Sequence, residues 1–274
     1  MKPDDLKHVI YEKKDGVGYV TLNRPEVQNA LNARMLQELV SVWEEVRDDG
    51  EVQVVILTGA GEAFMQGRGD VQRVKDSLDA GPLPPTRPYR YSWNTPASPK
   101  AHYLFKPVIA AVNGLCATSG LEQVSEADIV ICSDNATFYD NHVSYASIVH
   151  SAVALSKRLP YNHVMRMSLM GSHEVLDATR AYEIGLVTEV TTRGDLMPRA
   201  TEIAKTIMRN SPIAVQASVE ILWHGLSMGL RDAVQLDSYM QRWYHTHPDY
   251  EEAGRALVEG REPVWQTPFW HGGH

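Results

Sequence analysis

Residues 107–142, PVIAAVNGLCATSGLEQVSEADIVICSDNATFYDNH, combine an apolar run, a turn of small residues and the start of a helix. Residues 108–112 form a short apolar run bounded by Pro107 and Asn113-Gly114, which predicts a buried strand that ends in a turn. The small residues 117–120 follow, and helix-forming residues come directly after them. A helix that begins here would point its first N–H groups at the mouth of the turn. Such donors could hold a developing oxyanion, usually the largest single contribution to catalysis in acyl chemistry.

Strand and helix patterns alternate on the N-terminal side of this stretch. Residues 17–22 alternate in polarity and are rich in β-branched side chains, so they predict a strand. Asn32 is a candidate helix cap, apolar residues recur at helical spacing up to residue 46, and residues 52–58 predict another strand. A strand, a helix and a strand in this order favour a right-handed crossover and an α/β fold. Further helices are predicted over residues 175–184, 196–209, 213–226, 230–244 and 249–258.

Composition sets the outer limits on function. The 274 residues are 43% hydrophobic and 22% charged, as in an ordinary soluble protein. The net charge of −8 argues against a nucleic acid as the main partner, because phosphate binding favours a basic surface. No apolar run approaches the ~18 residues that span a bilayer, and the N-terminus lacks the apolar core of a signal peptide. We therefore expect a cytoplasmic protein with no membrane partner.

The two cysteines do not suggest a metal site. Cys116 and Cys132 both lie in the apolar stretch and lack the spacing of metal ligands. We expect them to be buried thiols, and the sequence predicts no metal centre.

Residues 107–142 resemble the corresponding segment of the crotonase family (enoyl-CoA hydratase/isomerase). In that family an apolar strand precedes Asn-Gly, an aromatic or apolar residue, a small-residue run, and then Glu-Leu and Asp-Ile. This chain supplies Asn113-Gly114, the small run 118–120, Glu122 and Asp128-Ile129. Other matches, in family order, are residues 21–26, 29–32, 54–59 and 61–67, then Ala178, Ala181, Gly185-Leu186-Val187, Glu259, Arg261 and Pro263.

The resemblance implies a fold and partners. It implies an α/β fold, with a crotonase-like ββα spiral core over residues 1–200 that holds the acyl and CoA pocket. Residues 201–274 would form a helical C-terminal trimerisation region that covers a neighbouring subunit's site. The implied assembly is a homotrimer or a dimer of trimers. Coenzyme A would be part of an acyl-CoA substrate, and no permanently bound cofactor is implied.

Two backbone N–H groups form the oxyanion hole in the family. Ser119 matches one donor, at the start of the predicted helix. The other lies in the run 64–70, which is one residue longer before the aspartate than the family's run. Arg68 is its expected donor, with Gly69 as the alternative register, and a plain surface turn is the alternative interpretation of the run. The substrate-binding residues implied by the resemblance are Gln28, Ala30, Phe64, Gln66, Gly67, Gly120, Tyr139 and Tyr145.

The connection over residues 70–106 is rich in proline and aromatic residues. In the family this region usually forms part of the acyl pocket, so we expect an ordered wall, with a loose loop as the alternative. Its basic residues could receive the CoA phosphates or could be a solvated face. Gln28 stands where many members carry a basic residue beside those phosphates. The basic residues are Arg68, Arg73, Lys75, Arg87, Arg90 and Lys100.

The catalytic residues depart from the family pattern at one position. Glu122 matches the first of two glutamates that activate water and deliver a proton in family hydratases. The second belongs to a Phe-x-x-Pro-Glu pattern, and residues 138–142 place His142 at that position. Counting back from residues 158–160 places it instead on Ser144. Neither alignment restores a second glutamate.

A histidine at this position leaves several functions open. With an ordinary pKa near 6.5, His142 suits a general base at neutral pH, oriented by Asp140 or Glu122. The family's β-diketone hydrolases also carry a histidine on this loop. The leading hypothesis is an enzyme of the enoyl-CoA hydratase/isomerase type with Glu122 as acid/base. The alternatives are a C–C bond hydrolase with His142 as base and a catalytically silent acyl-CoA-binding protein. Tyr139, Tyr145 and His150 are candidates for the pocket lining, and His142 itself could be a hydrogen-bonded pocket residue without a catalytic role.

Overall fold

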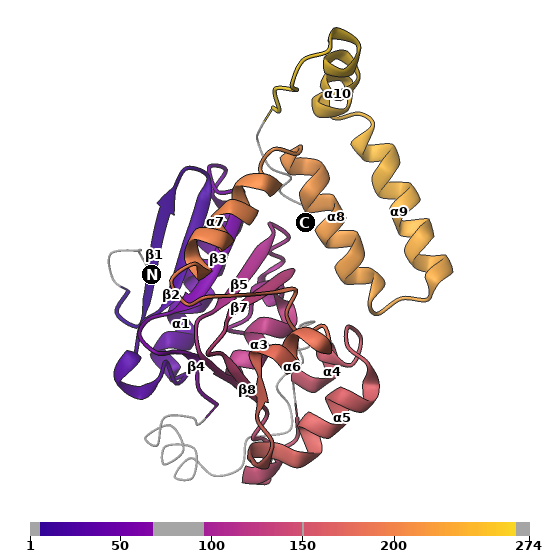
Figure 1. Ribbon diagram of the computed structural model, residues 1–274. Helices are drawn as coiled ribbons and strands as arrows, with labels where there is room; N and C mark the ends of the chain where they lie inside the picture. The colour runs from indigo at the N-terminus through magenta and orange to yellow at the C-terminus, as the bar shows by residue number, and fades with distance from the viewer. Residues whose placement is uncertain (1–5, 68–95, 150, 267–274) are drawn as a thin grey trace.

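Two sheets form the centre of the fold in the computed structural model, which describes residues 6–67, 96–149 and 151–266 (Figure 1). The larger sheet has the strand order β1-β2-β3-β5-β7-β10, and the smaller sheet has the order β4-β6-β8-β9. The strands of the larger sheet are β1 (Val9–Lys14), β2 (Val17–Leu22), β3 (Val54–Gly59), β5 (Val108–Val112), β7 (Ile129–Ser133) and β10 (Glu189–Thr191). Those of the smaller sheet are β4 (Ala63–Met65), β6 (Leu115–Ala117), β8 (Thr137–Tyr139) and β9 (Leu176–Asp177).

Successive turns of the chain add one strand to each sheet. Strands β3, β5 and β7 pair in parallel in the larger sheet, and β4, β6 and β8 pair in parallel in the smaller one. Each strand of the first set is followed directly along the chain by its counterpart in the second set. This repeat is the ββα spiral that the sequence resemblance predicted. The antiparallel hairpin β1–β2 opens it through Asp15-Gly16, both with positive φ, as a two-residue type I′ turn requires.

Helices lie on the outside of the sheets and carry the spiral from one turn to the next. The longest of the N-terminal part is α1 (Ala33–Asp48), capped by Asn32, whose side chain accepts the Met35 N–H at 2.8 Å. The remaining helices are α3 (Ser119–Glu126), α4 (Ser151–Leu155), α5 (Tyr161–Met170), α6 (Ala178–Glu183), α7 (Leu196–Ile207), α8 (Pro212–Gly225), α9 (Leu230–Tyr244) and α10 (Pro248–Glu259). Short 3-10 turns are η2 (Pro25–Val27), η3 (Pro99–His102), η4 (Val143–Tyr145) and η5 (Gly171–His173).

Two details differ from the elements expected from the sequence. The predicted helix over residues 175–184 begins as strand β9, and only α6 is helical, because the Asp177 side chain caps it by accepting the Arg180 N–H at 2.7 Å. Helix α7 crosses residue 200 and packs on the larger sheet, with Leu196, Ala200 and Ala204 in one buried cluster with strand residues. The sheet-packed core therefore extends past residue 200, and the projecting helical region begins after α7.

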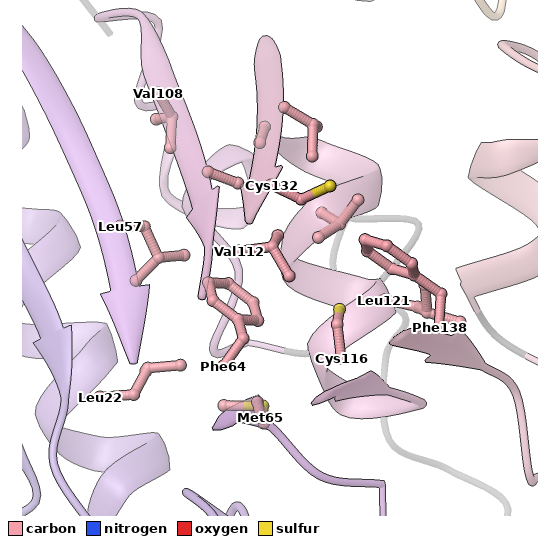
Figure 2. Close-up of a cluster of buried hydrophobic side chains, with 14 of the residues drawn as sticks. Leu22, Leu57, Phe64, Met65, Val108, Val112, Cys116, Leu121, Cys132 and Phe138 are labelled. Carbon is pink, nitrogen blue, oxygen red and sulfur yellow. The ribbon is translucent and has the colours of Figure 1, made fainter. Parts of the chain in front are cut away.

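Apolar side chains from both sheets and from α3 form one continuous core (Figure 2). Phe64 and Phe138 of the smaller sheet face the same cluster as Leu57 and Val112 of the larger sheet. The cluster also holds both cysteines, as free buried thiols, which confirms the expectation from the sequence. Burial raises the pKa of the Cys132 thiol to about 12 and that of Cys116 well above its ordinary value. These thiols are therefore core groups and not nucleophiles.

Helices α8, α9 and α10 project away from this core (Figure 1). No residue of α9 is buried, and large apolar side chains along the projecting helices are exposed. They include Leu222, Leu230, Val234, Leu257 and Val258. Among the described residues no helix has the length and apolar content needed to cross a bilayer.

The buried carboxylate of Glu38 joins the beginning of β1 to α1. It is fully buried, accepts the backbone N–H groups of Lys7 (3.1 Å), His8 (2.7 Å) and Val9 (2.9 Å), and is paired with Arg34 at 2.6 Å. Burial raises the pKa of Glu38, but the hydrogen bonds from Arg34 and the backbone outweigh it, so that the pKa lies below its ordinary value.

We therefore expect Glu38→Ala to lower the free energy of unfolding by about 3 kcal/mol at neutral pH, because three backbone N–H groups, that of the buried Val9 among them, lose their acceptor. The contribution is present above the unfolded pKa and is lost as the pH falls through the lower folded pKa. Urea unfolding of the variant and of Glu45→Ala, an exposed glutamate on the same helix, measures the effect. Equal destabilisation by the two substitutions would contradict this role for Glu38.

Candidate active site

Helix α3 begins at a strained residue that several hydrogen bonds hold in place. Thr118 has φ +49°, in the left-handed region that threonine rarely adopts. Its N–H donates to the Tyr139 carbonyl (3.2 Å), and its hydroxyl donates to the Asn141 side chain (2.5 Å) and accepts the Asn141 N–H (3.2 Å). This sharp turn from β6 into α3 sets the direction in which the first turn of the helix faces.

The first N–H groups of α3 are the donors predicted for an oxyanion. The Glu122 N–H bonds to the Thr118 carbonyl at 3.0 Å, so the helical ladder begins there. The earlier N–H groups, those of Ser119, Gly120 and Leu121, have no acceptor within a helix that starts at Ser119. Ser119 is half-buried, so a substrate oxygen can reach its N–H from one side.

Glycine allows the end of β4 to approach this turn closely. A Cβ on Gly67 would lie 2.1 Å from the Thr118 hydroxyl oxygen, and one on Gly120 would lie 2.8 Å from the Met65 carbonyl oxygen. No other residue fits at either position without displacing its neighbour. The loop after β4 therefore lies against the start of α3, as the two-donor arrangement requires.

The structure brings several more of the predicted residues to the same place. The Gln66 N–H donates to the Gln28 carbonyl at 2.9 Å, and the Gln66 side chain donates to the Val27 carbonyl at 2.8 Å. Gln28 is exposed and Ala30 is buried behind it. The loop before α1 and the loop after β4 are thus joined beside the start of α3.

Some predicted residues lie outside the described part of the chain. These are Arg68 and its alternative Gly69, His150, and the basic residues Arg73, Lys75, Arg87 and Arg90. Of the two oxyanion donors, only Ser119 is described.

Lys100 is described, and the expectation that it could receive CoA phosphates is wrong. Its side chain is fully buried and its ammonium group lies 2.9 Å from the Asp128 carboxylate and 3.2 Å from the Leu104 carbonyl. A lysine held inside in this way cannot reach a phosphate at the surface.

The side chain of Phe64, an expected substrate-binding residue, is fully buried among the core residues of Figure 2. Only the backbone of Phe64 could therefore contact a substrate. Tyr139 is half-buried at the end of β8, and Tyr145 is 57% exposed in η4.

Asp140 and His142 form a hydrogen-bonded pair at the end of β8. The ring Nδ1 of His142 lies 2.6 Å from Oδ1 of Asp140, and the His142 backbone N–H donates to the same oxygen at 3.0 Å. The Ser151 hydroxyl donates to Oδ2 of Asp140 at 3.4 Å. Asp140 is fully buried and His142 is 9% exposed. With Nδ1 bound to Asp140, proton exchange with a substrate would use Nε2.

His142 and Glu122 interact electrostatically. Burial lowers the pKa of His142, but the hydrogen bond and charge of Asp140, together with the charge of Glu122, outweigh it and raise the pKa above its ordinary value of 6.5. Glu122 itself is 3% exposed, on the first turns of α3. A buried carboxylate and a histidine with a raised pKa therefore share one site next to the first N–H groups of α3.

Ser144, the other position considered for the second glutamate, lies at the surface. It is exposed, and its hydroxyl accepts the Ser172 N–H at 2.9 Å and lies 3.1 Å from the Ser172 hydroxyl. Of the two positions considered for the second glutamate, His142 is the one near Glu122.

Thr118, Asn141 and Ser151 hold the site together, and sequence reasoning did not assign them. Their roles depend on contacts between separate turns of the spiral, which no local pattern reveals. Within residues 6–67, 96–149 and 151–266, no three His, Cys, Asp or Glu side chains gather in a way that could hold a metal ion.

Known proteins share this fold and this sequence pattern. A sequence profile of the enoyl-CoA hydratase/isomerase family matches residues 12–268. The chain is 33% identical over 262 residues to a short-chain-enoyl-CoA hydratase of Clostridium acetobutylicum, covering 94% of this chain and 97% of that one. It is 31% identical over 264 residues to an enoyl-CoA hydratase of Mycobacterium tuberculosis, covering 94% and 96%. The crystal structure of an enoyl-CoA hydratase/isomerase from Mycobacterium paratuberculosis matches with a TM-score of 0.84 and 35% identity, covering 96% and 99%.

The architecture is therefore that of an α/β crotonase fold with two mixed sheets and C-terminal helices. The chain belongs to the enoyl-CoA hydratase/isomerase family.

The pair Asp140–His142 can be tested without any assumption about activity. In an NMR titration we expect the His142 ring to have a pKa above 6.5, and Asp140→Asn to lower that pKa, because the carboxylate charge is lost. The raised pKa stabilises the fold below the unfolded pKa, and this contribution disappears as the pH rises through the folded value. Asp177→Asn, an exposed helix cap away from the site, serves as control. An unchanged His142 pKa in Asp140→Asn would contradict the pairing.

Proposed function

We propose that this chain is an acyl-CoA enzyme of the enoyl-CoA hydratase type, with Glu122 and His142 as its acid/base pair. The observation that carries the proposal is that hydrogen bonds between Thr118 and Asn141 hold the loop of the Asp140–His142 pair at the start of α3, the helix that carries Glu122. The related enoyl-CoA hydratases support an acyl-CoA as the substrate, with coenzyme A bound as part of it.

The proposed reaction uses each group once. A thioester carbonyl oxygen would accept the Ser119 N–H and a second N–H from the loop after Gly67. In the dehydration direction Glu122 removes the proton from Cα, and the electron pair moves toward the carbonyl oxygen, where the N–H groups stabilise the charge. The C–O bond at Cβ breaks, and the His142 imidazolium gives its proton to the departing hydroxide, which leaves as water. Hydration is the reverse sequence.

The charges of the pair suit this division of roles. Asp140, and to a smaller extent Glu122, raise the pKa of His142 above its ordinary value, so the imidazolium persists to higher pH than in an unperturbed histidine. A carboxyl group and an imidazole in one site are suited to act as one base and one acid.

A second function has one observation in its favour. The 2.6 Å contact to Asp140 fixes the ring of His142, as in sites where a histidine acts as a general base on water. This arrangement supports the alternative of a hydrolase that cleaves a C–C bond of a β-diketone.

Kinetics of a medium-chain enoyl-CoA test the leading proposal. We expect Glu122→Gln and His142→Gln each to lower kcat by about 10²- to 10⁴-fold, because each removes one proton-transfer group. In dehydration of the corresponding 3-hydroxyacyl-CoA, wild-type kcat/KM should fall as the pH rises through the raised pKa of His142, because the imidazolium is the acid, and His142→Gln should lose this falling limb. The matched controls are Glu183→Gln and His173→Gln, each at an exposed position.

The alternative functions predict different results in the same assay. Hydration that survives Glu122→Gln would contradict its role. Turnover of a cyclic β-diketone but of no enoyl-CoA would favour the hydrolase. Calorimetric binding of an acyl-CoA without turnover of any substrate would favour a silent acyl-CoA-binding protein.

The projecting helices also lead us to propose a homotrimer or a dimer of trimers. Exposed apolar side chains of α8 to α10 would be removed from water by contact with another copy. We expect sedimentation equilibrium to give three or six copies, and Leu230→Glu with Val258→Glu to give smaller species. Ile10→Glu, at an exposed apolar position on β1, is the control. A wild-type monomer would contradict the proposal.

A further inference from the structure

Gln123 is a buried polar residue next to Glu122 that the reaction described above does not use. Its side chain is 0% exposed, and in the described part of the chain neither its amide oxygen nor its amide nitrogen has a hydrogen-bond partner. Nearly all buried amides in folded proteins are paired, because an unpaired one loses its hydrogen bonds to water without replacement. The family pattern has leucine after the glutamate, so an apolar side chain would serve a purely structural role at this position.

The position of Gln123 follows from its neighbours on α3. Gly120, Gln123 and Glu126 are spaced three residues apart and lie along one side of the helix. Gly120 packs against the Met65 carbonyl at the end of β4. The Glu126 carboxylate accepts the Lys100 N–H in η3 at 2.8 Å. Gln123 therefore lies between the end of β4 and the beginning of η3.

The inference takes the acyl chain to run along α3 from the first N–H groups of the helix. A thioester oxygen at the first N–H groups of α3 places the reacting carbons beside Glu122. Gln123 lies about 4.5 Å further along the helix axis than Gly120, at 1.5 Å per residue. Acyl atoms beyond Cβ that follow the helix would come next to the Gln123 amide.

We propose that Gln123 is a specificity-determining residue that hydrogen bonds to a neutral oxygen group, a hydroxyl or a carbonyl, on the acyl chain beyond the reacting carbons. The inference rests on the proposed function. An amide offers both a donor and an acceptor, which match such a group. A carboxylate on the chain is disfavoured, because Glu126 is a buried acid on the same side of α3 and Glu122 is the buried acid next to Gln123 in the sequence.

The experiment compares a pentenoyl-CoA with its derivatives hydroxylated at the fourth or the fifth carbon. We expect wild-type kcat/KM to be at least about tenfold higher for one of the hydroxylated substrates, and Gln123→Leu to abolish this ratio. Gln216→Leu is the matched control, since Gln216 is a buried glutamine with an unpartnered amide nitrogen on α8, and it should leave the ratio unchanged. Thermal unfolding is followed for both variants.

The outcomes separate this inference from the proposed function. Hydration of all three substrates without preference, or a preference that persists in Gln123→Leu, would overturn the inference and leave the proposed function standing. If Gln123→Leu is more heat-stable and the ratio of kcat/KM values between the substrates is unchanged, Gln123 has a structural role only. This result would also overturn the inference. If none of the three substrates is turned over, calorimetry measures how tightly each of the same three acyl-CoAs binds. Tighter binding of a hydroxylated one that depends on Gln123 would support the inference while the proposed function fails, and equal or absent binding would overturn both.

Discussion

The close contact between the end of β4 and the start of α3 is the constraint on which the site depends. Gly67 lies against Thr118 and Gly120 against Met65, at distances where a Cβ would collide with its neighbour. The contact fixes the strained turn at Thr118, and that turn fixes the direction of the first N–H groups of α3. Glu122 follows one helical turn later, so the distance between an oxyanion donor and the acid/base group is set by the helix itself.

A second constraint is the buried charge of Asp140. It holds the His142 ring through Nδ1 and is itself held by the Ser151 hydroxyl. With Glu122 nearby, the site contains two acids and one histidine whose pKa is raised. Family hydratases are expected to use two glutamates here, and this chain combines one glutamate with an Asp–His pair. This difference puts an imidazole where a second carboxylate is expected, and the fold is still that of the family.

The sequence predicted the parts of this site that follow from local patterns. The apolar strand, the small-residue turn and the helix from Ser119 are typical local signals, and the position of His142 followed from residues 138–142. The buried positions of Phe64 and Lys100 were not predicted. They depend on packing between turns of the spiral and on the Asp128 carboxylate. The left-handed conformation of Thr118 was also missed, because threonine itself disfavours it.

The central claim is that Glu122 exchanges a proton with the carbon next to a thioester held at the start of α3. Incubation of a saturated acyl-CoA in D₂O, followed by NMR, measures this step without requiring water addition or a correct acyl tail. The account predicts that deuterium enters at Cα with wild-type protein, and that exchange in Glu122→Gln falls to the rate without protein. Binding of the acyl-CoA with no exchange, or exchange that persists in Glu122→Gln, would contradict it.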